Sequence, residues 1–228
     1  MVGSQENRVG ELMGAVDRAD SADGLLRAVE ALAAVADQVA VPKLIEVLGF
    51  NNPGAAVAAV EGLIAVGEPA VLPLMEQLDG YNYGARAWAI RALSGIGDPR
   101  SLEILWKAAV GDFALSVRRS AARGLGMIHW ELLAQEGVPG GQSLPLKEAK
   151  ERTMEVLLET SWDPEWVVRY AAIVGLEGLA KSRVEFPETG LPKLEERLNQ
   201  IIAEDEVLAV RGRSKMAQEM LKQWMQNA

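Results

Sequence analysis

Cysteine is absent from the 228 residues, and histidine occurs once, at His129. Without thiols the chain has no disulfide, no cysteine-based zinc site and no thiol nucleophile of its own. A single histidine also excludes a metal site built on several imidazoles. No segment approaches about eighteen uninterrupted apolar residues, and residues 1–17 lack the apolar core of a signal peptide. We therefore expect a soluble cytoplasmic protein that uses neither a membrane nor a metal.

Basic residues are in the minority, because 23 Lys and Arg face 32 Asp and Glu and the net charge is −9. This balance disfavours general nucleic-acid binding, which needs a basic surface against phosphates. The charge is uneven, however, since residues 81–130 contain 7 basic and 3 acidic side chains, a net of +4. An anionic ligand is therefore expected first within this window.

Alanine-rich segments recur along the chain, and each ends in a leucine. The first spacings between these leucines are 31, 30 and 32 residues, and the last is 51, which is one period plus an insertion of about 20 residues. The closing leucines are Leu32, Leu63, Leu93, Leu125 and Leu176. Spacings this regular indicate stacked repeats.

Each repeat has the pattern of two helices. Gly67 and Gly97 are suited to end the first helix with a positive φ. The acid and proline that follow, as in Asp98-Pro99, suit the cap and first turn of the second helix. Because one helix pair cannot bury its apolar face alone, the pairs must stack. The sequence therefore predicts an all-α fold, a HEAT-like repeat α-solenoid of five to six helix pairs.

We expect one repeat domain over residues 1–228, with a capping element at each end. Residues 6–19 are predicted to form an N-terminal cap helix and residues 207–226 a C-terminal cap. Glycines and prolines predict an insertion loop at 131–145 and a shorter loop at 182–190. Long repeat surfaces usually bind other molecules, so binding is the default function.

The segment 79–88 is the first candidate for a ligand site. It contains two of the three tyrosines, followed by an arginine and a tryptophan, and turn residues keep its first half out of the core. Aromatic walls and a cation would suit a flat, anionic ligand. Equally, the tyrosines could simply cover a helix end. The candidate residues are Tyr81, Asn82, Tyr83, Arg86 and Trp88.

The arginines of the basic window fall into two groups. Arg86, Arg118 and Arg169 each lie seven residues before a closing leucine, and arginines at one repeat position are typical of ion-pair ladders between repeats. Arg91 and Arg119 lie off that position and are freer to contact a ligand. Asp163, which precedes Pro164, is interpreted as a helix cap.

Residues 81–126 carry a resemblance to a known family. The stretches YNYGARAWA and GDFALSVRR are the most specific parts, whereas GIGDP turns are common to many HEAT repeats. This region resembles the smaller, F-type subunit of the E/F class of phycobilin lyases of cyanobacteria, and the repeat layout extends the likeness over most of the chain.

The resemblance implies a subunit of a bilin lyase that works as a heterodimer with an E-type HEAT-repeat subunit. The pair would bind phycocyanobilin as its substrate, without a cofactor, and deliver it to a cysteine of the apo-phycocyanin α subunit through a thioether bond. A long, flat dianion suits the aromatic and arginine residues described above. Asp79 and Asp112 are the candidate catalytic acids that would protonate the bilin as sulfur adds.

Family members that also isomerise the chromophore have a His-Cys pair near this loop, whereas this chain has Tyr81-Asn82-Tyr83-Gly84 there. We therefore expect a lyase that does not isomerise. Two other functions stay open: a non-enzymatic phycobiliprotein-binding protein that acts in bilin detachment or phycobilisome degradation, and a plain protein scaffold.

Overall fold

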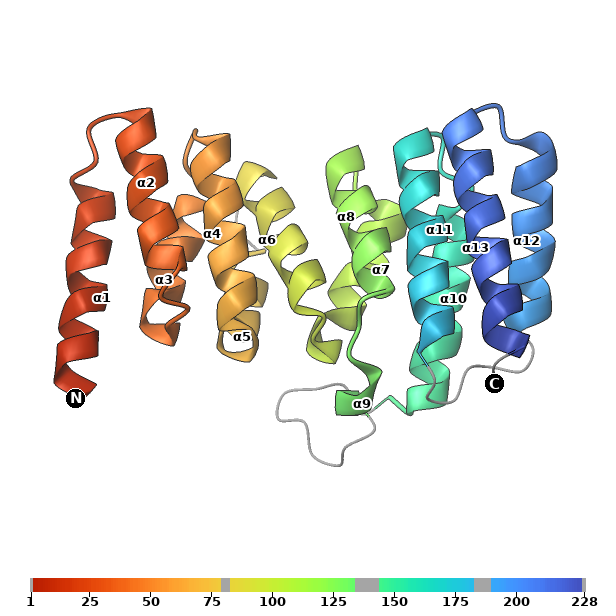
Figure 1. Cartoon of the computed structure of the whole chain (residues 1–228), viewed down its shortest axis with the longest axis horizontal. Helices are drawn as coiled ribbons and strands as arrows, with labels where there is room; N and C mark the ends of the chain where they lie inside the picture. Colours follow the sequence, from red (N-terminus) through yellow and green to blue (C-terminus); the bar gives the residue numbers. More distant parts are fainter. Residues whose placement is uncertain (1, 79–82, 134–143, 183–189, 227–228) are drawn as a thin grey trace. The chain divides into compact units, whose positions relative to one another are not determined.

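The computed structural model describes residues 2–78, 83–133, 144–182 and 190–226. They fold into helices, and no strand occurs in these ranges. The chain divides into two compact units, Met1–Ile96 and Gly97–Ala228. The all-α prediction is confirmed, and twelve of the thirteen α-helices in the described ranges form six pairs, three in each unit, while the short α9 lies outside them (Figure 1).

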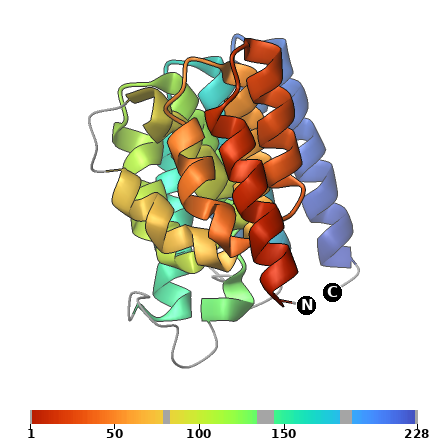
Figure 2. The ribbon, with the colours of Figure 1, turned by 90° about the vertical axis from the view of Figure 1, so that its left-hand side faces the viewer.

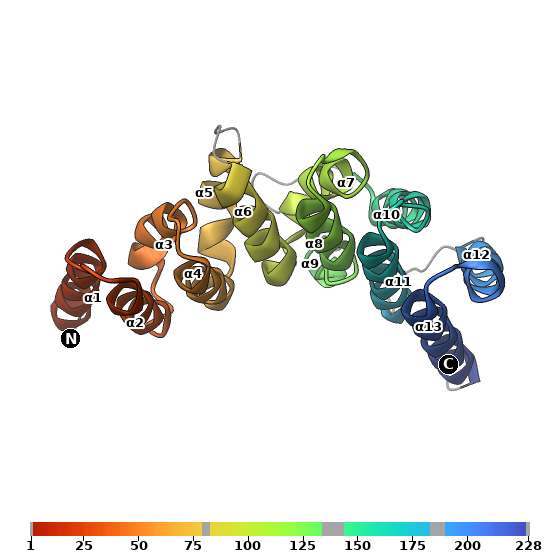
Figure 3. The ribbon, with the colours of Figure 1, turned by 90° about the horizontal axis from the view of Figure 1, so that it is seen from above.

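The described part of unit 1 contains six α-helices and two short 3₁₀ turns. The helices are α1 (Val2–Asp17), α2 (Ala22–Ala33), α3 (Val41–Val47), α4 (Pro53–Val66), α5 (Val71–Gln77) and α6 (Tyr83–Ile96). The 3₁₀ turns η1 (Gln38–Ala40) and η2 (Glu68–Ala70) precede α3 and α5. Helices α2, α4 and α6 pack in one row and α3 and α5 in a second (Figure 3), while α1 lies against α2 (Figure 2).

The core of unit 1 lies between these two rows. Its fully buried side chains include Leu32, Leu44, Leu63, Leu74 and Leu93. Helices α2 and α4 approach closely at Gly62, where an added Cβ would lie 2.7 Å from the Cβ of Ala33. The alanine- and glycine-rich composition of these helices therefore has a direct packing purpose.

The first element of unit 2 is η3 (Pro99–Ser101), and seven α-helices follow in the residues of this unit that the structure describes. These are α7 (Leu102–Gly111), α8 (Leu115–Leu125), α9 (Trp130–Leu133), α10 (Leu146–Thr160), α11 (Trp166–Lys181), α12 (Gly190–Glu204) and α13 (Leu208–Gln226). Helices α8, α11 and α13 form one row, and α7, α10 and α12 form the other (Figure 3).

Most predicted boundaries match the helices. Helix α1 covers most of the expected N-terminal cap helix and α13 the C-terminal one. Gly67 and Gly97 have φ of 74° and 69°, as expected for helix ends. The acids before the prolines are expected to cap the second helix of each pair. Asp98 instead caps the η3 turn, and Glu68 is the first residue of η2. The first three residues of the insertion loop expected at 131–145 are helical, because they belong to α9. Residues 134–143 of this loop, and residues 183–189 of the shorter loop expected at 182–190, lie outside the described residues.

Candidate functional site

Helix α6 holds most of the predicted bilin-binding residues. Tyr83 is its first residue, whereas Asp79, Tyr81 and Asn82 lie outside the described part of the chain. Trp88 is half-buried and packs against the core of unit 1. Three residues further along the helix, the exposed Arg91 places its guanidinium carbon 5.5 Å from the centroid of the Trp88 ring. This pair is an aromatic surface with a cation held above it.

The structure does not place all predicted α6 residues on one side. Arg86 precedes Trp88 by two positions, which turns their side chains about 200° apart around a helix. Arg86 is half-buried, and Arg91 is exposed. Trp88 and Arg91 therefore form the accessible part of this candidate site, and Arg86 lies on another side of the helix.

Asp112 and Arg119 belong to unit 2. The Asp112 carboxylate accepts a hydrogen bond of 2.9 Å from the Ala114 N–H, and its carbonyl accepts one of 2.8 Å from the Arg118 guanidinium. Asp112 thus shapes the turn between α7 and α8. Its predicted role as a catalytic acid stays a prediction.

Arg119 is exposed on α8, and sequence analysis missed the aromatic side chains on the neighbouring helix. Trp166 and Tyr170 lie one turn apart at the start of α11, and their relative exposures are 44% and 37%. Tyr170 follows Arg119 by the same 51 residues that separate the two repeats. This equivalent repeat position was the sequence signal that could have linked Tyr170 to Arg119. The helices that carry the two residues, α8 and α11, pack side by side (Figure 1).

The predicted arginine ladder is confirmed for the two members in unit 2. The Arg118 guanidinium binds the Asp163 carboxylate through contacts of 2.7 and 3.1 Å, and Arg169 binds Asp205 through contacts of 2.7 and 3.0 Å. All four side chains are largely buried. The hydrogen bonds that Arg118 donates to Asp163 raise the pKa of Arg118, and those that Arg169 donates to Asp205 raise the pKa of Arg169. These arginines are structural and are not available to a ligand.

A second aromatic–cation contact lies beneath Trp162, which is 59% exposed. The guanidinium carbon of Arg197 lies 3.3 Å from the centroid of this ring. The same guanidinium donates to the hydroxyl and carbonyl oxygens of Ser161 at 2.7 and 2.8 Å. Burial lowers the pKa of Arg197 to about 10, so the group stays charged at neutral pH. Arg197 therefore packs against the Trp162 ring, which stays largely exposed.

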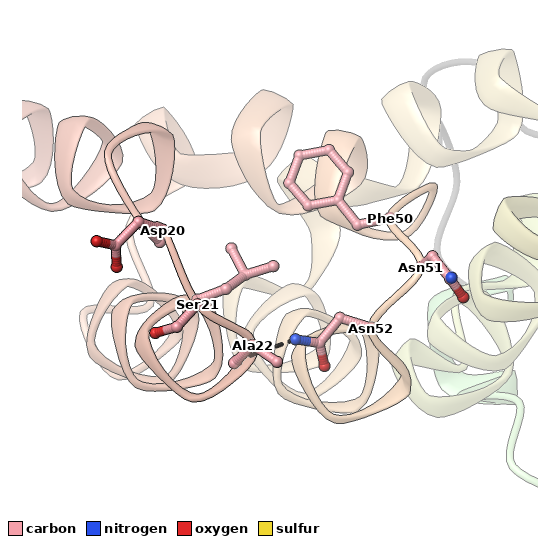
Figure 4. Close-up of a pocket in the computed structure, with 8 residues that line it drawn as sticks. Asp20, Ser21, Ala22, Phe50, Asn51 and Asn52 are labelled. Carbon is pink, nitrogen blue, oxygen red and sulfur yellow. Dashed lines mark hydrogen bonds between the residues drawn. The ribbon is translucent and has the colours of Figure 1, made fainter.

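A shallow cavity of about 300 Å³ lies in unit 1 between the α1–α2 turn and the α3–α4 turn (Figure 4). Two of its polar side chains, those of Ser21 and Asn52, are helix caps. The Ser21 hydroxyl accepts a hydrogen bond from the Gly24 N–H, and the Asn52 amide accepts from the Ala55 N–H and donates to the Ala22 carbonyl. None of the predicted site residues lines this cavity.

The described ranges contain neither a cluster of metal-binding side chains nor a membrane-spanning helix. No group of three or more His, Cys, Asp or Glu side chains there could hold a metal ion. None of the helices in those ranges is both long and apolar enough to cross a bilayer.

Comparisons with known proteins agree with the repeat architecture. The family model for the PBS lyase HEAT-like repeat matches residues 25–50 and 85–109. The phycocyanobilin lyase subunit beta of Pseudanabaena tenuis is 49% identical over 222 residues, which is 96% of this chain and 76% of that protein. The phycocyanin alpha phycocyanobilin lyase CpcF of Synechocystis sp. is 54% identical over 75% of this chain and 76% of its own length.

A solved structure shows the same relationship in three dimensions. The complex of CpcE and CpcF of phycocyanin lyase from Nostoc sp. contains a chain that is 46% identical and superposes with a TM-score of 0.68. The superposition covers 80% of this chain and 99% of that one. The fold and the comparisons together define the class of protein as an α-solenoid built from PBS lyase HEAT-like repeats. The chain belongs to the family of phycocyanobilin lyase beta subunits.

Proposed function

We propose that this chain is the β subunit of a heterodimeric bilin lyase. The enzyme attaches phycocyanobilin to a cysteine of the phycocyanin α subunit, and the partner is an E-type HEAT-repeat subunit. The observation that supports this most is the identity of 49% over 96% of the chain with a phycocyanobilin lyase subunit beta. The match to a chain of the CpcE–CpcF complex supports the choice of partner.

The attachment reaction requires the lyase to position the bilin and does not require a nucleophile on this chain. The client thiol adds across the ethylidene double bond of the bilin, so a carbon–sulfur bond forms and the thiol proton ends on the bilin. A chain without cysteine is therefore suited to the reaction, because the sulfur comes from the client. The lyase must hold a flexible tetrapyrrole in one conformation and bring its ethylidene group to the thiol.

Two surfaces of the described chain offer groups of the required kind. In unit 1, Arg91 lies over Trp88. In unit 2, Arg119 on α8 is exposed beside the helix that presents Trp166 and Tyr170. Aromatic faces can stack on the bilin, and guanidinium groups can bind its propionates. Tyr81, Asn82, Tyr83 and Arg86 remain predicted bilin-binding residues, and Asp79 and Asp112 remain predicted proton donors.

The test is a reconstitution with the Nostoc sp. CpcE as the E-type subunit. This chain, CpcE, phycocyanobilin and the apo-phycocyanin α subunit are combined, and covalent bilin is detected on a denaturing gel. We expect a coloured band that requires both lyase subunits. Replacing this chain with the Nostoc sp. CpcF is the positive control. An adduct with CpcF but none with this chain contradicts the proposal, and release of bilin from finished phycocyanin would instead support the detachment function.

A further inference from the structure

A seven-residue motif occurs three times in unit 2, each time at the start of the second helix of a pair. It begins with Asp, has Val in sixth place and ends with Arg. The three copies are residues 112–118, 163–169 and 205–211. Their valines are all buried, with relative exposures of 0 or 1%, so the three copies occupy equivalent places in the fold.

Within each copy the arginine is held by its own aspartate. The arginine Nη1 donates to the carbonyl oxygen of that aspartate, at 2.8 Å in the first copy, 3.0 Å in the second and 3.3 Å in the third. The aspartate carboxylate in turn accepts the backbone N–H two residues later, at 2.8–2.9 Å. This local geometry aims the guanidinium of each copy in the same direction, toward the next helix pair.

In the first two copies the guanidinium then binds the aspartate of the next copy. Arg118 uses Nε and Nη2 to bind Asp163, and Arg169 uses the same two nitrogens to bind Asp205. A planar guanidinium fork matched to a carboxylate in this way is among the strongest ion pairs in proteins. Each of these two pairs joins one helix pair to the next.

In the third copy, none of the carboxylates in the described ranges binds the arginine. Arg211 is half-buried on α13, and its carbonyl contact to Asp205 is the one hydrogen bond that it makes within the described residues. No further copy of the motif follows it in the sequence. The Nε and Nη2 of Arg118 and Arg169 bind a carboxylate at the start of the next helix pair, and a carboxylate of that kind is the matching partner for Arg211.

The rest of this side of α13 is also unlike the corresponding side of the preceding helices. Ala122 on α8 and Ile173 on α11 are fully buried, whereas the equivalent residue on α13 is the exposed Lys215. Lys222, two turns further, is exposed as well. Arg213 of α13 is already paired with Glu177, which leaves three basic residues and one acidic residue on this helix for other contacts: Arg211, Lys215, Lys222 and Glu219. Such a surface is complementary to acidic groups.

We propose that the outer side of α13 docks the E-type subunit, whose helix-start carboxylate binds Arg211 as a third ion pair of the ladder. This proposal rests on the heterodimer of the proposed function and adds the surface through which the heterodimer forms. The partner is a helical-repeat chain that presents Asp or Glu at the start of a helix pair. The ladder of unit 2 would then continue from one subunit into the other.

The test compares Arg211→Glu with Lys107→Glu in binding to the Nostoc sp. CpcE, measured by isothermal titration calorimetry. Both variants change the net charge equally, and Lys107 is an exposed cation of α7 far along the chain from the ladder's end. We expect Arg211→Glu to weaken binding at least about 10-fold, because a buried ion-pair partner is lost and a like charge replaces it. We expect Lys107→Glu to bind as the wild type does. Arg211→Gln, which removes only the charge, serves if the reversed charge disturbs folding.

The outcomes separate this proposal from the proposed function. If Arg211→Glu and Arg211→Gln both bind CpcE as tightly as the wild type does, the α13 docking surface is wrong, and the heterodimer is unaffected. If the Nostoc sp. CpcF binds CpcE and this chain does not, the heterodimer itself is wrong. Self-association of this chain that Arg211→Glu abolishes would assign the surface to a second copy and overturn the E-type subunit as its partner.

Discussion

At the scale of single residues, the arginines of unit 2 divide into structural and accessible ones by their position in the repeat. Arg118 and Arg169 are buried in ion pairs, while Arg119, the direct neighbour of Arg118, is exposed. Neighbouring positions on a helix point about 100° apart, which explains why adjacent arginines have different roles.

Replacing Arg118 by alanine should lower the free energy of unfolding by about 2–3 kcal/mol. The change removes two charge-assisted hydrogen bonds and leaves the largely buried Asp163 carboxylate without its guanidinium. Arg119→Ala is the matched control and should stay within about 0.5 kcal/mol of the wild type. Urea unfolding followed by circular dichroism measures both, and equal losses would show that the ladder adds no stability.

Asp205 gives the molecule a predictable response to acid. Burial opposes its ionisation, but hydrogen bonds from Arg169 and from the Val207 N–H outweigh it, so its pKa lies below the ordinary 3.8. The folded state therefore binds this proton less readily than the unfolded state does. The resulting stability is complete above pH 3.8 and is lost as the pH falls through the lower folded value.

Asp205→Asn should therefore cost about 2 kcal/mol at neutral pH and progressively less as the pH falls below the ordinary carboxylate range. Unfolding curves at several pH values between neutral and acidic test this. A stability difference between variant and wild type that is constant across all pH values would contradict the assignment.

The accessible arginine of unit 1 is the sharper target for activity. Arg91→Ala should reduce bilin transfer about 10-fold or more, because one charge-assisted contact to a propionate is lost, while the melting temperature stays close to that of the wild type. Lys107→Ala, another exposed cation, should change neither quantity. Unchanged transfer by the Arg91 variant would exclude this surface of α6 from the site.

At the scale of helices, glycine decides how closely neighbouring pairs approach. Gly126, which caps the end of α8, and Gly175 on α11 lie at one contact, where a Cβ on Gly126 would be 2.6 Å from the Gly175 Cα. Gly212 on α13 is the opposite case, since a Cβ there would meet nothing within 4 Å. The sequence alone does not distinguish Gly175 from Gly212, because each lies inside a helix.

Alanine substitutions should therefore have opposite effects in α11 and α13. Gly175→Ala should destabilise by about 1–3 kcal/mol, because the new methyl group would collide with the Ala122 carbonyl and lie 2.7 Å from Leu157 Cδ2. Gly212→Ala should stabilise by about 0.5–1 kcal/mol, since it removes the helix-interior cost of glycine without a clash. Thermal denaturation of both variants provides the test, and destabilisation at Gly212 would contradict the open space assigned to it.

The helix pairs, their ends and the Arg118 and Arg169 positions could be predicted because they depend on local patterns that repeat. The partners of those arginines could not be, since Asp163 and Asp205 lie 45 and 36 residues further along the chain. The insertion after Leu125 also changes the repeat length, which hides the equivalence of Arg119 and Tyr170. Residues 79–82 lie outside the described chain, so the part of the candidate site that was most specific in sequence stays a prediction.

At the scale of the whole molecule, two units of three helix pairs each present their own aromatic and cationic surface. Unit 1 offers Trp88 with Arg91, and unit 2 offers Trp166 and Tyr170 beside the helix of Arg119. The single histidine lies in unit 2, where the His129 N–H donates to the Gly97 carbonyl and its side chain is exposed.

The product should therefore keep the double-bond system of phycocyanobilin. Moving a double bond requires a group that removes a proton from one carbon and returns one to another, and a thiol or imidazole titrating near neutral pH does this best. This chain has no thiol and one imidazole, and tyrosine, with an ordinary pKa of about 10, is a poor base at pH 7. Absorption and mass spectra of the adduct test the prediction, with His129→Gln expected to give the same product as the wild type. A blue-shifted adduct of equal mass would show that the lyase also isomerises the bilin, and its disappearance in His129→Gln would identify His129 as the base.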